Sequence, residues 1–117
     1  MPAQLSAIVI DCADPAKLSA FYREVTGWKV GYADDDFVYL GEGPVQLAFQ
    51  RVPGYVGPGW PDDAKHAHLD LQVPDVEKAA GELVALGATR PDFQPGDGKW
   101  VVLADPEGHV FCLTPAE

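Results

Sequence analysis

The stretch HAHLDLQVPD (residues 66–75), with the run that follows it to Gly87, decides how this chain folds because it repeats an earlier pattern. The earlier copy is AIVIDCAD (residues 7–14), which runs on to Gly27. In each copy a short apolar strand ends in a turn that contains an aspartate, and an amphipathic helix and a glycine follow. A duplicated unit of this kind sets the architecture of the whole domain.

The composition describes one globular domain of 117 residues with a strongly acidic surface. Eighteen acidic against eight basic residues give a formal net charge of −10, which repels nucleic-acid phosphates and anionic lipid. We therefore expect neither nucleic acid nor membrane as a partner. The charge favours cationic ligands at long range; the alternative is that it only aids solubility.

No apolar run approaches the roughly 20 residues that a membrane span needs. The first residues show neither a basic region nor a long apolar core, so we expect no signal peptide. Two cysteines without a disulfide pattern fit a reducing compartment, which predicts a cytoplasmic protein.

The sequence pattern of each half of the chain predicts one helix and four strands. In the first half Asp14 and Pro15 start the helix and Gly27 ends it. In the second half Asp75 caps a helix that runs to Gly87. The predicted strands cover residues 5–11, 28–32, 37–40 and 45–51 in the first half, and residues 67–73, 89–94, 99–103 and 109–114 in the second. The strand at 89–94 is weak because Pro91 interrupts it.

The pattern predicts an α+β fold made of two tandem βαβββ modules, with curved mixed sheets around a cup and helices on the outer face. Module one covers residues 1–51, a linker loop covers 52–65, and module two covers 66–117. The linker is rich in proline and glycine and contains Tyr55 and Trp60. These aromatic side chains either form a lid or pocket wall, or fill the junction between the halves.

Side chains alternate across a strand, so each predicted strand has one face toward its helix and one toward the cup. Apolar residues occupy the helix side, among them Ile8, Phe49 and Phe111. The residues that we expect to bind a ligand lie on the cup side or in flanking loops: Gln46, Gln50, Tyr55, Trp60, His68, Asp70, Trp100 and Cys112.

Six short motifs are distributed over nearly the whole sequence: IVIDCADP (8–15), FY (21–22) before GW (27–28), LAFQRVP (47–53), HLDL (68–71), LGA (86–88) and LADPEG (103–108). In these motifs the chain resembles the vicinal oxygen chelate superfamily of glyoxalases, extradiol dioxygenases and bleomycin-resistance proteins. More narrowly, it is similar to the small glyoxalase-like domain proteins common in actinobacteria.

The resemblance implies four metal-ligand positions, which fall on Ala7, Gln46, His68 and Cys112. Only His68 is retained as a strong ligand, Gln46 is a neutral donor, and Ala7 cannot coordinate a metal. His66 and Asp70 lie two residues from His68, roughly 7 Å away along a strand, which is too far to share one ion without distortion. We therefore predict a degenerate metal site and no cofactor, with a divalent metal as the alternative.

The roles of His68 and Cys112 are considered next from the sequence alone. His68 is either a general base or ligand contact, or a histidine that bridges polar groups in the cup. Cys112 is expected to be a buried spectator thiol, because no basic neighbour in sequence lowers its pKa. Cys12 has the opposite parity to the cup residues, so a bridge between the two cysteines is not expected.

The interpretation that follows is a bleomycin-resistance-like protein that binds a small organic ligand, cationic or aromatic, without a catalytic metal. The alternative is a lyase, isomerase or dioxygenase that uses His68 with or without a divalent ion. A regulatory module with a filled cup is a third hypothesis. By analogy with small members of the superfamily, we expect a homodimer.

Overall fold

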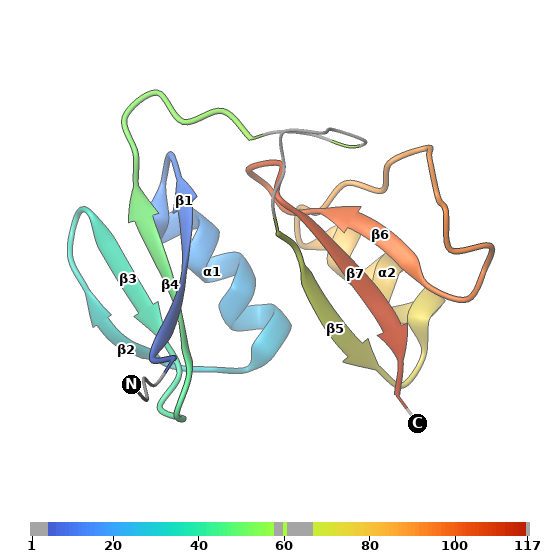
Figure 1. Ribbon diagram of the computed structural model, residues 1–117, viewed down its shortest axis with the longest axis horizontal. Coiled ribbons are helices and arrows are strands. Elements are labelled where there is room, and N and C mark those ends of the chain that lie inside the picture. The colour runs from blue at the N-terminus through green and yellow to red at the C-terminus, as the bar shows by residue number, and fades with distance from the viewer. Residues whose placement is uncertain (1–4, 58–59, 61–66, 117) are drawn as a thin grey trace, which may run out of the picture. The chain divides into compact units, whose positions relative to one another are not determined.

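The computed structural model describes residues 5–57, 60 and 67–116, and the chain divides into two compact units, residues 1–56 and 57–117. Each unit has one sheet and one helix (Figure 1). The elements in chain order are β1 (Ala7–Cys12), α1 (Pro15–Thr26), β2 (Val30–Ala33), β3 (Phe37–Leu40), β4 (Gln46–Arg51), β5 (Leu69–Val73), α2 (Val76–Ala85), β6 (Val101–Ala104) and β7 (Val110–Pro115). The predicted α+β class is confirmed, and the order of elements repeats except that the second unit has one strand fewer.

In the first unit the strand order is β1-β4-β3-β2, which we call sheet A. β1 pairs with β4 in parallel, and the other neighbours are antiparallel. Helix α1 packs on β3 and β4, where Phe49 stacks on Tyr22 with ring centroids 5.4 Å apart. Both rings are almost fully buried, as predicted for a residue on the helix side of β4.

The helix ends follow from short-range chemistry that the sequence predicts well. The carboxylate of Asp14 accepts a hydrogen bond from the backbone N–H of Lys17, and Asp75 accepts one from Lys78 in the same way. Helix α1 ends at Gly27, whose φ of 72° is left-handed and therefore suits glycine. Helix α2 ends one residue earlier than predicted, with Leu86 as its C-cap.

β1 lies at the edge of sheet A, and this changes the burial of its apolar side chains. Ile8 was expected under the helix, but 38% of it is exposed because α1 lies over β3 and β4. In contrast, Cys12 at the end of β1 is fully buried. Leu86, expected on the buried face of α2, is also exposed because it lies beyond the last helical turn.

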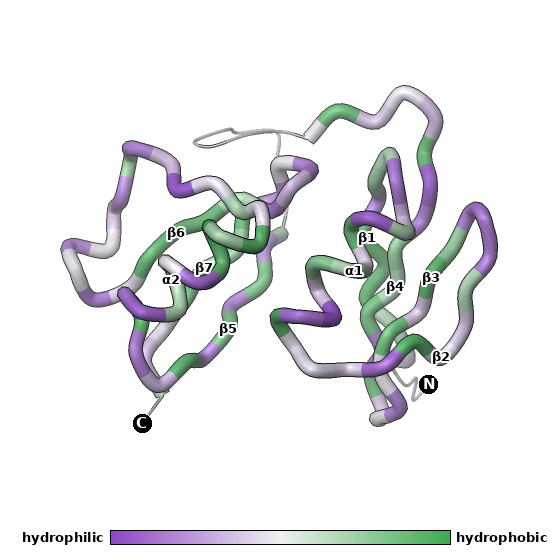
Figure 2. Tube along the Cα trace, turned by 180° about the vertical axis from the view of Figure 1, so that it is seen from behind, coloured by the Kyte–Doolittle hydropathy of each residue, from purple (hydrophilic) through white to green (hydrophobic). Residues whose placement is uncertain are grey.

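In the second unit the strand order is β5-β7-β6, which we call sheet B. Helix α2 packs on β6 and β7 through Ala80 and Leu83, and Leu103, Phe111 and Leu113 are completely buried. Figure 2 shows hydrophobic residues along β6 and β7 and mostly hydrophilic residues along the loop that leads into β6. The second unit therefore has its own small core.

The strand predicted at residues 89–94 is wrong, because only an isolated bridge between Thr89 and Ala104 forms there. Pro91 lacks an N–H group and cannot continue a ladder. The side chain of Gln94 makes the hydrogen bonds to the β6 backbone that a neighbouring strand would make. Its Oε1 accepts from the N–H of Val102 at 2.9 Å, and its Nε2 donates to the carbonyls of Val102 at 2.8 Å and Pro91 at 2.9 Å.

The remaining predicted strands all exist, with ends shifted by at most about two residues, and the strand at 37–40 has the predicted bounds. Within the described residues, no helix has the length and apolar character that a membrane crossing requires.

Candidate functional site

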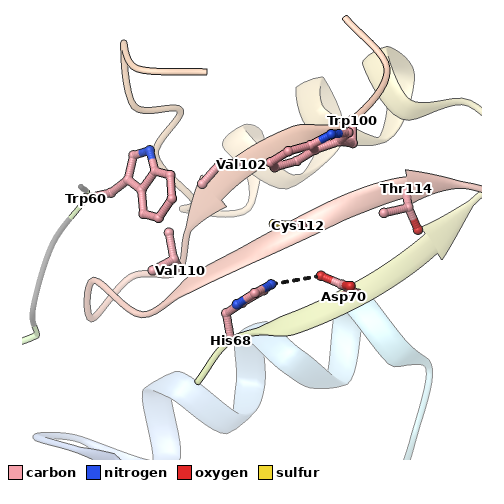
Figure 3. Close-up of a pocket in the computed structure, with 8 residues that line it drawn as sticks. All are labelled: Trp60, His68, Asp70, Trp100, Val102, Val110, Cys112 and Thr114. Atoms are coloured by element: carbon pink, nitrogen blue, oxygen red, sulfur yellow. Dashed lines mark ion pairs between the residues drawn. The ribbon is translucent and has the colours of Figure 1, made fainter. Parts of the chain in front are cut away.

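A pocket of about 340 Å³ lies in the second unit, on the side of sheet B away from the buried leucines that face α2 (Figure 3). All of its lining residues belong to this unit: Trp60, His68, Asp70, Trp100, Val102, Val110, Cys112 and Thr114. We call it the sheet B pocket. Its volume falls in the range of small-molecule sites, about 300–1,000 Å³.

Strand register explains why these side chains meet. In the parallel pair Asp70 is opposite Cys112, and in the antiparallel pair Val102 is opposite the same cysteine. Asp70, Cys112 and Val102 therefore form one row across the three strands, on one face of the sheet. His68 lies two residues before Asp70 and so shares that face. The predicted alternation of β5 and β7 is confirmed here.

His68 and Asp70 form an ion pair, with Nε2 and Oδ1 3.2 Å apart and both side chains about half exposed (Figure 3). The expectation that these residues are too far apart to share an ion is therefore wrong for Asp70. The backbone fixes the separation of the two Cα atoms, but the side chains lean along the strand and bring their polar ends together. His66 lies outside the described residues.

Cys112 completes a cluster with this pair. One ligand atom from each of His68, Asp70 and Cys112 lies within 4.8 Å of the other two. The cysteine is 8% exposed and lies on the central strand of the sheet, whereas Asp70 lies on the edge strand β5 and His68 directly precedes that strand. The cluster therefore combines a buried sulfur with two accessible donors.

Two tryptophans supply most of the aromatic surface of the pocket. The indole Nε1 of Trp60 donates a hydrogen bond to the carbonyl of Phe93 at 2.9 Å, and the two rings stack with centroids 6.0 Å apart. Trp100 precedes β6, and a Cβ on Gly96 would clash with the carbonyl oxygen of Trp100 and with its ring. Only glycine allows this close approach of the backbone.

The structure brings together five of the eight residues predicted to bind a ligand, namely Trp60, His68, Asp70, Trp100 and Cys112. Sequence reasoning did not select Val102, although it follows from the register opposite Cys112. It also missed Phe93, which holds Trp60 in place, because this contact depends on a loop that the sequence pattern describes as a strand.

The other three predicted residues, Gln46, Gln50 and Tyr55, belong to the first unit and do not line the sheet B pocket. The amide Nε2 of Gln46 donates to the carbonyl of Gly41 at 3.1 Å, and the backbone N–H of Tyr55 donates to the carbonyl of Val52 at 3.1 Å. Their contribution to ligand binding stays a prediction.

The four-position metal set that the resemblance implies does not fit the residues present. Ala7 carries no donor atom in its side chain, and Gln46 offers only a neutral amide oxygen. Only His68 and Cys112 of that set offer strong donors, and the second unit supplies both. Cys12 and Cys112 are both buried and are not joined by a disulfide, as predicted.

Comparison with known proteins agrees with the architecture. Residues 7–114 match the family model of the glyoxalase-like domain. A glyoxalase/bleomycin resistance protein/dioxygenase family enzyme from Burkholderia phytofirmans PsJN is similar in structure, with a TM-score of 0.74 and 22% identity over 98% of this chain and 100% of that one. A search of curated proteins finds no significant match.

Two other similar structures come from proteins whose names refer to an antibiotic. A bleomycin-binding protein from Streptomyces verticillus, complexed with copper(II)-bleomycin, has a TM-score of 0.62 and 17% identity over 100% of this chain and 99% of that one. The fosfomycin resistance protein of Mesorhizobium loti has a TM-score of 0.69 and 18% identity over 100% and 95%. Because the family model spans nearly the whole sequence, this chain belongs to the glyoxalase-like domain family, within the vicinal oxygen chelate superfamily.

Proposed function

We propose that this protein binds a small organic molecule with aromatic and cationic character in the sheet B pocket. The observation that carries the proposal is the combination, in one pocket, of two tryptophan side chains with the carboxylate of Asp70. Indole faces attract both flat apolar rings and cations. A carboxylate at the edge of the same pocket adds attraction for positive charge.

The expected energies are modest but sufficient for selectivity. A cation over an indole face gains about 0.5–2 kcal/mol, depending on how well the site excludes water. The half-exposed Asp70 contributes less than a buried carboxylate would, about 0.2–1 kcal/mol. The net charge of −10 adds a long-range attraction that raises the rate of encounter.

The comparison supports a binding role without fixing the ligand. One similar structure is a bleomycin-binding protein in complex with a metal-bound drug, and another is a fosfomycin resistance protein. At 17–18% identity these similarities concern the fold. They support the proposal only in that one protein with this fold binds a drug.

Tryptophan fluorescence of the full-length protein tests the proposal with proflavine, a flat aromatic cation, and with neutral acridine of the same ring size. We expect proflavine to bind more tightly. Trp100→Ala should weaken both ligands about 3- to 30-fold, and Asp70→Asn should weaken only proflavine, by about 2- to 5-fold. Trp28→Phe is the matched control, because Trp28 does not line this pocket. Equal affinity of wild type and Trp100→Ala would contradict the proposal.

A second candidate function is catalysis of the lyase, isomerase or dioxygenase type. The observation that favours it is the His68–Asp70 pair, since a carboxylate orients an imidazole for proton transfer. Its test is turnover of a hemithioacetal of an α-ketoaldehyde or of a catechol by wild type, compared with His68→Asn. Turnover that the variant loses would favour the enzyme, and binding without turnover would favour the binding protein.

The proposal also includes a cytoplasmic homodimer. Several large apolar side chains of the first unit are exposed, including Val9 at 46% and Tyr32 at 55%, which suits a surface that a second copy covers. Light scattering of the purified protein is the test, and a monomeric mass would refute the dimer.

A further inference from the structure

The lining of the sheet B pocket is polar on the side of one strand and apolar on the side of another. His68 and Asp70 stand on the β5 side, and both are about half exposed, whereas Val102 and Trp100 stand on the β6 side. We infer that the pocket selects flat polycyclic ammonium ions that carry their positive charge on one long edge, the edge that faces β5. The inference rests on the proposed function and names the ligand class that the same pocket prefers.

The long axis of such a ligand follows the strands. The pocket is lined by Val110, Cys112 and Thr114 of β7, which span about 13 Å at about 3.3 Å per residue. The three strands are together only about 10 Å across, because neighbouring strands lie about 4.8 Å apart. Trp60 lies toward the Val110 end and Trp100 toward the Thr114 end (Figure 3). A fused ring system between the two indoles therefore has one long edge toward β5 and the other toward β6.

The β5 side has the groups that receive a positive charge. Asp70 Oδ1 lies 3.2 Å from His68 Nε2, and a carboxylate accepts further hydrogen bonds through both of its oxygens. The side chain of Asp70 is more than half exposed, so an ammonium group reaches it while keeping part of its hydration. Gln72 lies two residues further along β5, opposite Thr114, and is exposed. Its amide therefore extends the polar edge beyond the pocket lining.

The polar backbone groups along the outer edge of β6 are already engaged within the protein. The N–H and carbonyl groups of Val102 bond to the side chain of Gln94, and those of Ala104 bond to the backbone of Thr89. The indole N–H of Trp60 donates to a carbonyl of the loop before β6. An ammonium group turned toward this side would lose water without gaining any of these groups as a partner, which disfavours the reversed orientation.

Two isomers test the inference, because they have the same rings and the same charge. In 9-(aminomethyl)anthracene the ammonium group is on a long edge, and in 2-(aminomethyl)anthracene it is near one end. The anisotropy of anthracene fluorescence, measured with the full-length protein at one fixed pH and salt concentration, gives both affinities. We expect the long-edge isomer to bind about 2- to 5-fold more tightly, as for one exposed charge contact. Equal affinities in the wild type would overturn the inference.

Variants of the polar edge show which side chain reads the position of the charge. Asp70→Asn should bind the two isomers equally, whereas a structural role of Asp70 would weaken both alike and keep the preference, which would also overturn the inference. Asp35→Asn removes an exposed carboxylate of the first unit and is the matched control, so it should keep the preference. Gln72→Glu adds a second carboxylate to the edge and should strengthen the long-edge isomer about 2- to 5-fold. Unchanged affinity would overturn the extension of the edge to Gln72.

The proflavine titration keeps this inference separate from the proposed function, and circular dichroism checks that each variant folds. Proflavine binding together with equal affinities for the two anthracenes refutes only the preference for a long-edge charge. If neither proflavine nor either anthracene binds, the proposed function itself is refuted.

Discussion

The two units have similar arrangements of strands and helix. They differ in the number of strands and in the side chains on the face of the sheet away from the helix. Sheet A has four strands, whereas sheet B has three because residues 89–94 form only the isolated bridge of Thr89 with Ala104. The face of sheet A away from α1 carries neutral amides and the neighbouring rings of Tyr32, Tyr39 and Phe37. The corresponding face of sheet B carries histidine, aspartate and cysteine.

The unit that lost a strand is the one with the pocket described above. The loop that replaces the strand positions the pocket walls, since Phe93 holds Trp60 and Gly96 makes room for Trp100. A paired strand at the same place would extend the sheet and leave no loop over β6. The two units are therefore similar frames, and in one of them an unpaired loop supports the walls of a pocket.

The largest expected effect is on the free energy of unfolding, and it tests whether the cores of the two units contribute equally to stability. Phe49 and Phe111 are both fully buried, on the helix-facing sides of β4 and β7. Replacing either with alanine removes a large ring and leaves a cavity, at a cost of about 3–5 kcal/mol in the free energy of unfolding. Urea unfolding of both variants is the measurement. A large loss in only one of them would show that the two cores do not contribute equally.

The next prediction compares two glutamines: the side chain of Gln94 takes the place of a strand, whereas that of Gln46 does not. Gln94→Ala removes three hydrogen bonds and leaves the buried N–H of Val102 unpaired, so it should cost about 2–4 kcal/mol. Gln46→Ala removes one hydrogen bond to Gly41 and should cost about 1 kcal/mol. Equal losses in urea unfolding would mean that Gln94 does not substitute for the strand.

A smaller effect distinguishes ligand binding from folding at His68. His68→Ala removes a half-exposed side chain from the pocket, so proflavine should bind about 3- to 10-fold more weakly, as expected for one lost polar contact. The free energy of unfolding should change by less than about 0.5 kcal/mol, as for most surface substitutions. If affinity is unchanged, His68 has a structural role and the pocket assignment at this position is wrong.

The smallest effect concerns exposed carboxylates, one in each unit. The hydrogen bond from the Tyr32 hydroxyl, and then those from backbone N–H groups, lower the pKa of Asp34. The hydrogen bonds and charge of Arg90 lower the pKa of Glu77. A lowered folded-state pKa stabilises the protein above the ordinary carboxyl values, and this contribution is lost as pH falls through the lowered values.

Asp34→Asn and Glu77→Gln should therefore each reduce slightly the difference between the urea midpoints at pH 7 and pH 3. Solvent screening keeps both effects small. A larger pH dependence in either variant than in the wild type would contradict the sign of the corresponding pKa shift.

Much of the fold could be predicted because the sequence repeats itself and local rules are strong. Asp14, Asp75 and Gly27 fix helix ends through backbone chemistry that involves only near neighbours. Strand alternation placed His68 and Asp70 on the same side of β5, opposite to Leu69 and Leu71. These features depend on residues close in sequence, and the sequence by itself determined them.

The tertiary structure alone decided how side chains on that face meet. The 3.2 Å contact of His68 with Asp70 depends on rotamers, which the strand spacing does not specify. The replacement of a strand by the Gln94 side chain, and the support of Trp60 by Phe93, are contacts over 8 and 33 residues. Such contacts form only when the sheet is complete, because the β6 backbone must first present its edge to the loop.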